Sequence, residues 1–220
     1  MQKKMFNDKY SLTKAVLEGK KTQSRIIIPE SQLKNIEKFQ EEYFNDTLDF
    51  LEGKELLEQY FLVEKRKKPR YAVGEVLAVA QSYQMLWETE PDALICTEGS
   101  QVETYVAKHY PGNTVEQINR CAGWKNKMFV RADLMPHQIR ITDIRIQRLQ
   151  DISDEDCLKE GIKKSWWMNS SGRYLYGFGE KEDKWESPRE AYAALIDKVS
   201  GKGTWERNPW VFVYDFELVK

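Results

Sequence analysis

The chain has 220 residues, of which 41% are hydrophobic and 31% are charged, and its formal net charge is −1. This balance excludes a uniformly basic nucleic-acid-binding protein and an acidic disordered chain. The length fits a single domain, residues 1–220, with enough apolar side chains for a folded core.

Helical and strand patterns follow one another in the N-terminal part of the chain. Residues 11–18 have the apolar spacing of a short helix, and the β-branched run 26–28 predicts a strand. Residues 31–63 carry apolar side chains three and four positions apart, which predicts two helices. The basic stretch 65–70 fits either a solvated loop or a phosphate-binding patch. Residues 76–80 then predict a buried strand.

Residues 128–149 predict strands with one irregularity. Two pairs of isoleucines alternate with polar residues, but in shifted phase: Ile139 and Ile141, then Ile144 and Ile146. A phase change inside a strand indicates a bulge or tight turn near residues 142–143. The segment 153–161 predicts a short helix, with a serine cap, acidic residues in its first turn and a terminal glycine.

The C-terminal part contains the clearest strand of the chain. Residues 169–187 are rich in glycine, serine and charge, which predicts a loop, and a helix is expected to start at Pro188. Residues 210–218 place large apolar side chains on one face. The whole pattern predicts an α+β fold around a small, largely antiparallel sheet or barrel.

Cysteine and histidine usage bears on cofactors and compartment. Cys96, Cys121 and Cys157 are too widely spaced for a disulfide framework or a zinc motif, and there are two histidines. No apolar run reaches the roughly 18–20 residues that span a membrane, and the N-terminus lacks a signal-peptide core. We therefore expect a cytoplasmic protein with no metal, no other cofactor and no membrane partner.

Four motifs occur in one order along the chain. They are G-x-K-T-x-S-R at 19–25, Y-x-x-G-E-x-L-x-V at 71–79, R-L-Q-D-I-S-x-E-D at 148–156, and N-P-W-V at 208–211. Together they resemble the ASCH domain family of the PUA-like superfamily, in its phage-associated branch. The resemblance covers nearly the whole chain except about 31–68 and 84–120, which look like insertions.

The resemblance implies a PUA-like small β-barrel with surrounding helices and helical insertions. It also implies a pocket between the first helix, the lysine–threonine loop and the acidic helix. Family members are proposed to bind RNA or other nucleic acid, and one branch comprises amidohydrolases that deacetylate acetylcytidine with a lysine, a threonine and a glutamate. These three match Lys21, Ser24 and Glu160. The serine keeps the hydroxyl, whereas Gln81 replaces a charged segment of many phage members.

The first hypothesis is an amidohydrolase acting on a modified nucleoside. Ser24 would attack the acyl carbon, and Lys21 would take its proton if burial lowered the lysine pKa. Glu160 would shuttle the proton or orient Lys21. The same residues also fit an ordinary solvated turn and an unremarkable helix end.

Glu160 gives the pocket an argument beyond the resemblance. It stands at the end of the predicted helix, where the helix dipole disfavours an anion by roughly 0.3–1 kcal/mol. A carboxylate there indicates a cationic partner, and Lys21 is the candidate cation that the resemblance supplies. We therefore expect Lys21, Ser24 and Glu160 to converge on one pocket.

The second hypothesis is a binding module for RNA or a modified nucleoside. Residues 120–148 hold seven basic and two acidic residues with interleaved aromatic side chains, which suits phosphate contact and base stacking. A sheet whose outer face carries alternating arginines explains the same pattern. The residues expected to contact a ligand are Thr22, Arg25, Gln81, Trp124, Lys125 and Arg131.

A third hypothesis concerns the helical insertion 31–63. Its helices could dock a partner or a second copy of the chain, or they could cover the sheet. We favour the covering role.

Overall fold

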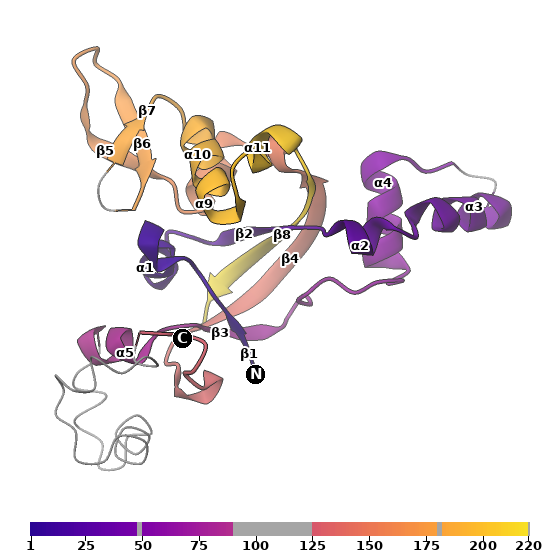
Figure 1. Cartoon of the computed structure of the whole chain (residues 1–220), viewed down its shortest axis with the longest axis horizontal. Helices are drawn as coiled ribbons and strands as arrows, with labels where there is room; N and C mark the ends of the chain where they lie inside the picture. The colour runs from indigo at the N-terminus through magenta and orange to yellow at the C-terminus, as the bar shows by residue number, and fades with distance from the viewer. Residues whose placement is uncertain (48–49, 90–124, 180–181, 220) are drawn as a thin grey trace.

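The computed structural model describes residues 1–47, 50–89, 125–179 and 182–219. Its strands form a five-stranded mixed sheet and a separate three-stranded antiparallel sheet, with helices around them (Figure 1). The α+β class predicted from the sequence is therefore confirmed. Most of the 84–120 insertion and Trp124 lie outside the described residues.

The five-stranded sheet carries the long strands of the chain. Its order is β1 (Gln2–Lys4), β3 (Val76–Val79), β4 (Gln138–Arg148), β8 (Trp210–Leu218) and β2 (Gln23–Ile27). The pair β1–β3 is parallel and the other pairs are antiparallel. The register of β4 against β8 shifts between Ile141 and Asp143, which confirms the predicted bulge.

The expected closed barrel is not formed by the strand pairs of the described residues. Strands β1 and β2 lie at opposite edges of the five-stranded sheet. The chain between them is occupied by a short 3₁₀ turn, η1 (Asp8–Tyr10), and by helix α1 (Leu12–Leu17), so no strand bridges the two edges there.

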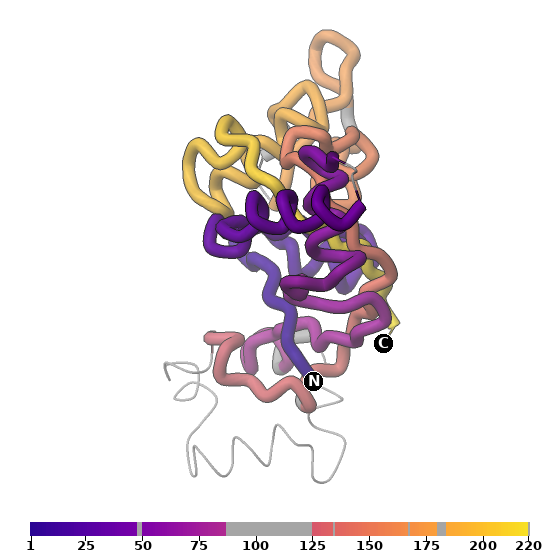
Figure 2. Tube along the Cα trace, turned by 90° about the vertical axis from the view of Figure 1, so that its right-hand side faces the viewer, coloured from indigo at the N-terminus to yellow at the C-terminus, as the bar shows by residue number. Residues whose placement is uncertain are grey.

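The second sheet corrects the loop predicted for 169–187. Strands β5 (Lys163–Met168), β6 (Tyr174–Phe178) and β7 (Glu182–Trp185) pair in that order. Phe178 stacks on Trp185 at 4.9 Å between ring centroids, and Tyr10 packs edge-on against Phe178. Alternating aromatic side chains thus order a segment whose polar composition suggested a loop. Its outer part projects away from the end of the molecule that holds both termini (Figure 2).

The helices lie beside the large sheet in groups. The remaining helical elements are α2 (Glu30–Leu33), α3 (Ile36–Thr47), α4 (Gly53–Glu58), the π-helical turn η2 (Gln59–Val63), α5 (Tyr83–Thr89), η3 (Ala132–Leu134), η4 (Leu149–Asp151), α9 (Asp154–Lys159), α10 (Pro188–Ser200) and α11 (Thr204–Arg207). Figure 1 shows α2–α4 on one side of the sheet, and α9–α11 next to the second sheet.

The helical segment within 31–63 packs on the large sheet through aromatic side chains. Phe39 contacts Tyr60, Tyr60 contacts Phe61, and Phe61 meets Phe212 of β8 at 5.1 Å between ring centroids. Phe61 is fully buried. The predicted helices are confirmed, and these contacts favour the role of a cover over the sheet.

Candidate functional site

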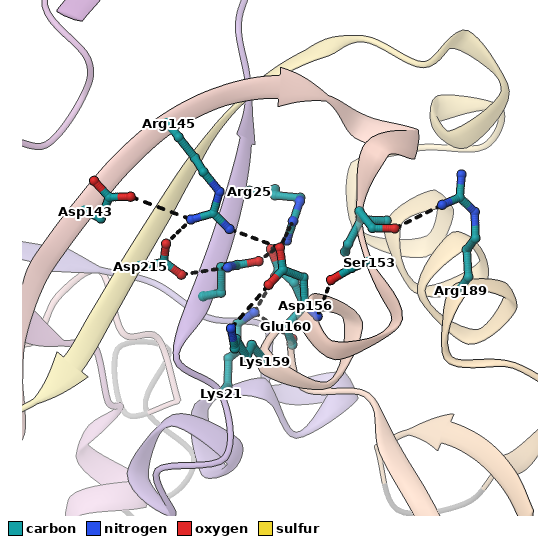
Figure 3. A network of polar contacts seen from close by, with 12 residues as sticks. Lys21, Arg25, Asp143, Arg145, Ser153, Asp156, Lys159, Glu160, Arg189 and Asp215 are labelled. Atoms are coloured by element: carbon teal, nitrogen blue, oxygen red, sulfur yellow. Dashed lines mark hydrogen bonds and ion pairs between the residues drawn. The ribbon is translucent and has the colours of Figure 1, made fainter.

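A buried ion pair joins the loop before β2 to the end of α9. The Lys21 ammonium donates to the Glu160 carboxylate oxygen Oε2 and to the Glu160 backbone oxygen, each at 2.6 Å (Figure 3). The two side chains are 3% and 7% exposed. The approach of Glu160 to Lys21 that the helix-end position indicated is therefore confirmed.

Local backbone geometry brings the two residues together. Ser153 caps α9 by accepting from the backbone N–H of Asp156, and Thr22 N–H donates to the Lys159 carbonyl at 2.9 Å. Gly161 follows with φ of 102°, where a Cβ would lie 3.1 Å from a Leu12 methyl group. Only glycine combines this backbone conformation with such close packing of α9 on α1.

Arg25 of β2 extends the ion pair into a network. Its guanidinium donates to Glu160 Oε1 and to Asp156 Oδ2, each at 3.0 Å. Arg145 of β4 donates to the same Asp156 oxygen at 3.0 Å and also contacts Asp215 of β8. The network therefore ties α9 to three strands of the large sheet (Figure 3).

Burial and pairing act in opposite directions on these groups. Burial lowers the pKa of Lys21, while the charge of Glu160 and its hydrogen bond oppose that shift. Burial would raise the pKa of Asp156, but the charges of Arg25 and Arg145 outweigh it and lower the pKa. Burial is the larger effect, so the pKa of Lys21 is lowered, and its 2.6 Å contact with Glu160 is the interaction that opposes loss of the proton.

A cavity of about 380 Å³ adjoins the network. It is lined by Lys21, Ser24, Arg25, Glu160 and Tyr192. The three residues that match the family's lysine, threonine and glutamate therefore converge on one cavity. A volume of this order falls within the range of small-molecule sites.

Two hydroxyl groups of this cavity have no hydrogen-bond partner among the described residues. Ser24 on β2 is 9% exposed and lines the cavity together with Lys21, whose ammonium is engaged by Glu160. The Tyr192 hydroxyl on α10 is buried and unpaired. Burial and the Glu160 charge raise the pKa of Tyr192 well above its ordinary value, so its hydroxyl stays protonated. Both groups are free to bond a ligand.

Lys4 is a further cation of the cavity that the sequence did not reveal. It lies at the end of β1, is 6% exposed, and its ammonium stands 5.1 Å from the Tyr71 ring centroid and 5.8 Å from those of Phe6 and Tyr214. Burial, followed by the Lys21 charge, lowers the pKa of Lys4 to about 7. Neither Lys4 nor Tyr192 belongs to a motif, because their burial arises from tertiary packing.

The other predicted ligand residues lie apart from this cavity. Thr22 is half-buried and uses its backbone to hold α9 and β8. Gln81 is fully buried, and its side-chain amide is unpaired among the described residues. Lys125 is exposed, and Arg131 forms an exposed pair with Asp133. Of the five expected ligand-contacting residues that the structure describes, Arg25 is the one that lines the cavity.

The basic residues of 125–148, the described part of the segment 120–148, are largely paired. Arg140 contacts Glu217 at 3.2 Å, and Lys127 is buried against Asp8. The Arg148 guanidinium lies 4.2 Å from the Trp210 ring centroid. With the Arg145 contacts above, this arrangement favours a sheet face neutralised by carboxylates over a free phosphate-binding stripe.

Comparison of the chain with protein-family models, with curated proteins and with solved structures finds no match. The resemblance to the ASCH family therefore rests on the four motifs.

In the described part of the chain, no cluster of three or more histidine, cysteine or acidic side chains could hold a metal ion. No helix there is long and apolar enough to cross a bilayer. Cys157 is a buried free thiol whose pKa is raised to about 12 by burial.

The network predicts a large stability loss for Glu160→Gln. This change leaves the buried Lys21 and Arg25 without their shared countercharge, which costs about 3–5 kcal/mol of unfolding free energy. The exposed Glu155→Gln on the same helix is the control, with an expected loss below about 1 kcal/mol. Urea unfolding of both variants measures the difference, and equal losses would contradict a central role for Glu160.

The lowered pKa of Lys4 predicts that Lys4→Met stabilises the folded chain by an amount that depends on pH. Because the folded chain lowers the pKa of Lys4 from 10.5 to about 7, the unfolded chain binds more protons between these values. Wild-type stability therefore rises with pH across this window, over a range of roughly 4–5 kcal/mol. We expect Lys4→Met to be more stable than wild type near neutral pH, and the advantage to shrink towards pH 10.5.

Denaturant unfolding across this pH window checks the prediction, with the exposed Lys14→Met as control. A stability difference between Lys4→Met and wild type that stays constant with pH would show that Lys4 carries its proton equally in both states.

Proposed function

We propose that the chain is an ASCH-type protein of the PUA-like superfamily that binds a modified nucleobase or nucleoside, free or within RNA. The ligand occupies the cavity lined by Lys21, Ser24 and Glu160. The observation that carries the proposal is the combination, in one cavity of about 380 Å³, of a preformed buried ion pair and unpaired hydroxyl groups. The assignment to the PUA-like superfamily belongs to the same proposal and is supported by the order of the four motifs.

The lining of the cavity suits a flat heterocycle with polar edges. Leu195 and Ile196 of α10 and Phe6 contribute apolar surface, which favours the faces of a base. The Tyr192 and Ser24 hydroxyls can bond the carbonyl and amine groups on its edge. Recognition of an unstacked base by apolar contact and edge hydrogen bonds is a common mode in RNA-binding proteins.

Hydrolysis of an acyl group on the base is the second candidate function. The convergence of Lys21, Ser24 and Glu160 on one cavity favours it. In this reaction the Ser24 oxygen bonds to the acyl carbon, the carbon–nitrogen bond breaks, and the serine proton passes to the leaving amine. Water then hydrolyses the serine ester and releases the carboxylic acid.

Binding is the better supported of the two functions. Lys21 donates to two oxygens of Glu160, and no hydrogen bond joins it to Ser24 in the described structure. The ion pair favours a charged Lys21, which cannot accept the serine proton. A charged Lys21 beside a hydroxyl suits a ligand carbonyl directly, whereas base catalysis needs the pair to be disrupted.

The test is a titration of cytidine, N4-acetylcytidine and N4-methylcytidine by calorimetry, with mass spectrometry of each mixture. We expect at least one modified nucleoside to bind, and Tyr192→Phe to weaken it about three- to tenfold through the lost hydrogen bond. Tyr174→Phe, on the second sheet, is the matched control and leaves the affinity unchanged. Lack of binding across the panel would contradict the proposed function, and release of acetate that Ser24→Ala abolishes would establish the hydrolase.

A further inference from the structure

The Lys4 ammonium is a buried charge without a countercharge. It forms no ion pair or hydrogen bond with another described residue, and its close contacts are the rings of Phe6, Tyr71 and Tyr214. Glu160, the carboxylate that favours its charged form, is already bonded to Lys21 and Arg25. An unpaired buried ammonium is costly, which is why its pKa is lowered, and an anion bound from solution would hold Lys4 in its charged form.

Arg70 provides a second cation beside the same ring. Its guanidinium carbon lies 5.6 Å from the Tyr71 ring centroid, against 5.1 Å for the Lys4 ammonium. Arg70 is exposed and forms no ion pair with a described residue, while its backbone N–H is fixed by the Tyr214 hydroxyl at 3.1 Å. Two cations that lie near one aromatic ring, neither of them in an ion pair with a described residue, can together attract an anion.

These two cations stand where two cavities adjoin. Lys4, Met5 and Arg70 line both the first cavity and a wider one of about 990 Å³, which includes the exposed Phe129. The charged side chains that line the first cavity are four cations and one carboxylate: Lys4, Lys21, Arg25, Arg70 and Glu160. A ligand that extends from the first cavity into the second therefore passes an uncompensated positive charge.

We propose that Lys4 and Arg70 form a subsite for the phosphate group of a nucleotide whose base occupies the first cavity. The identity of the base rests on the proposed function, whereas the phosphate subsite rests on the two unpaired cations. A guanidinium presents a planar set of donors to phosphate oxygens, and an ammonium adds a compact charge. The preferred ligand is then a nucleotide or a nucleotide unit of RNA, and not a free nucleoside.

In the primary experiment, inorganic phosphate is titrated into the full chain at constant ionic strength, and binding is measured by isothermal titration calorimetry. We expect wild type to bind phosphate, and Lys4→Met and Arg70→Gln each to weaken it about tenfold or more. Arg66→Gln is the matched control, because Arg66 also lies over a ring, that of Phe39, but is already paired with Glu64. Arg70 is exposed, so Arg70→Gln tests the subsite even if Lys4→Met does not fold.

Three outcomes overturn the proposal. Phosphate that binds no better than chloride, acetate that binds as tightly as phosphate, or an equal loss in Arg66→Gln each removes the subsite. A second arm compares a nucleoside that binds with its 5′-monophosphate, and we expect a preference for the monophosphate that both subsite variants abolish.

The two arms separate this subsite from the proposed function. Binding of a nucleoside with no gain from its phosphate leaves the proposed function standing and rejects the subsite. Phosphate binding that depends on Lys4 and Arg70, with no nucleoside bound, supports the subsite and rejects the nucleobase cavity.

Discussion

The carboxylate of Glu160 is the interaction on which the site depends. It lies at the end of α9, where the helix dipole disfavours it, and it is buried. Lys21 and Arg25 each bond one of its oxygens. Through Arg25 and Asp156 the same contacts anchor α9 to the large sheet. The wall of the cavity between β2 and α10 follows from this anchoring.

The charge balance of the cavity follows from these contacts of the Glu160 carboxylate. Glu160 is shared by Lys21 and Arg25, Lys4 makes no ion pair with a described residue, and Arg70 stands unpaired nearby among the described residues. The cavity is therefore electropositive at its junction with the wider cavity, and it offers neutral hydroxyls deeper inside. This gradient suits a ligand with a polar heterocycle at one end and an anion at the other.

The sequence predicts those parts that local rules determine. The Ser153 cap and the glycine end of α9 placed Glu160 at a helix terminus, and that unfavourable position pointed to a cationic partner, which the resemblance identified as Lys21. The bulge in β4 was visible as a phase change. The second sheet was missed because glycine and serine dilute the aromatic alternation of β6. Lys4 and Tyr192 were missed because only the packing of β1 and α10 against distant rings and charges buries them. The arginine pairs of β4 depend on cross-strand register, which a linear pattern does not show.

The most direct test of the account is a crystal structure of the chain with a bound modified nucleoside from the titrated panel. The account predicts that the base lies in the cavity, that the Tyr192 and Ser24 hydroxyls lie within hydrogen-bond distance of its edge, and that the Lys21–Glu160 pair stays intact. A ligand bound elsewhere, with both hydroxyls still unpaired, would contradict the assignment of this cavity as the functional site.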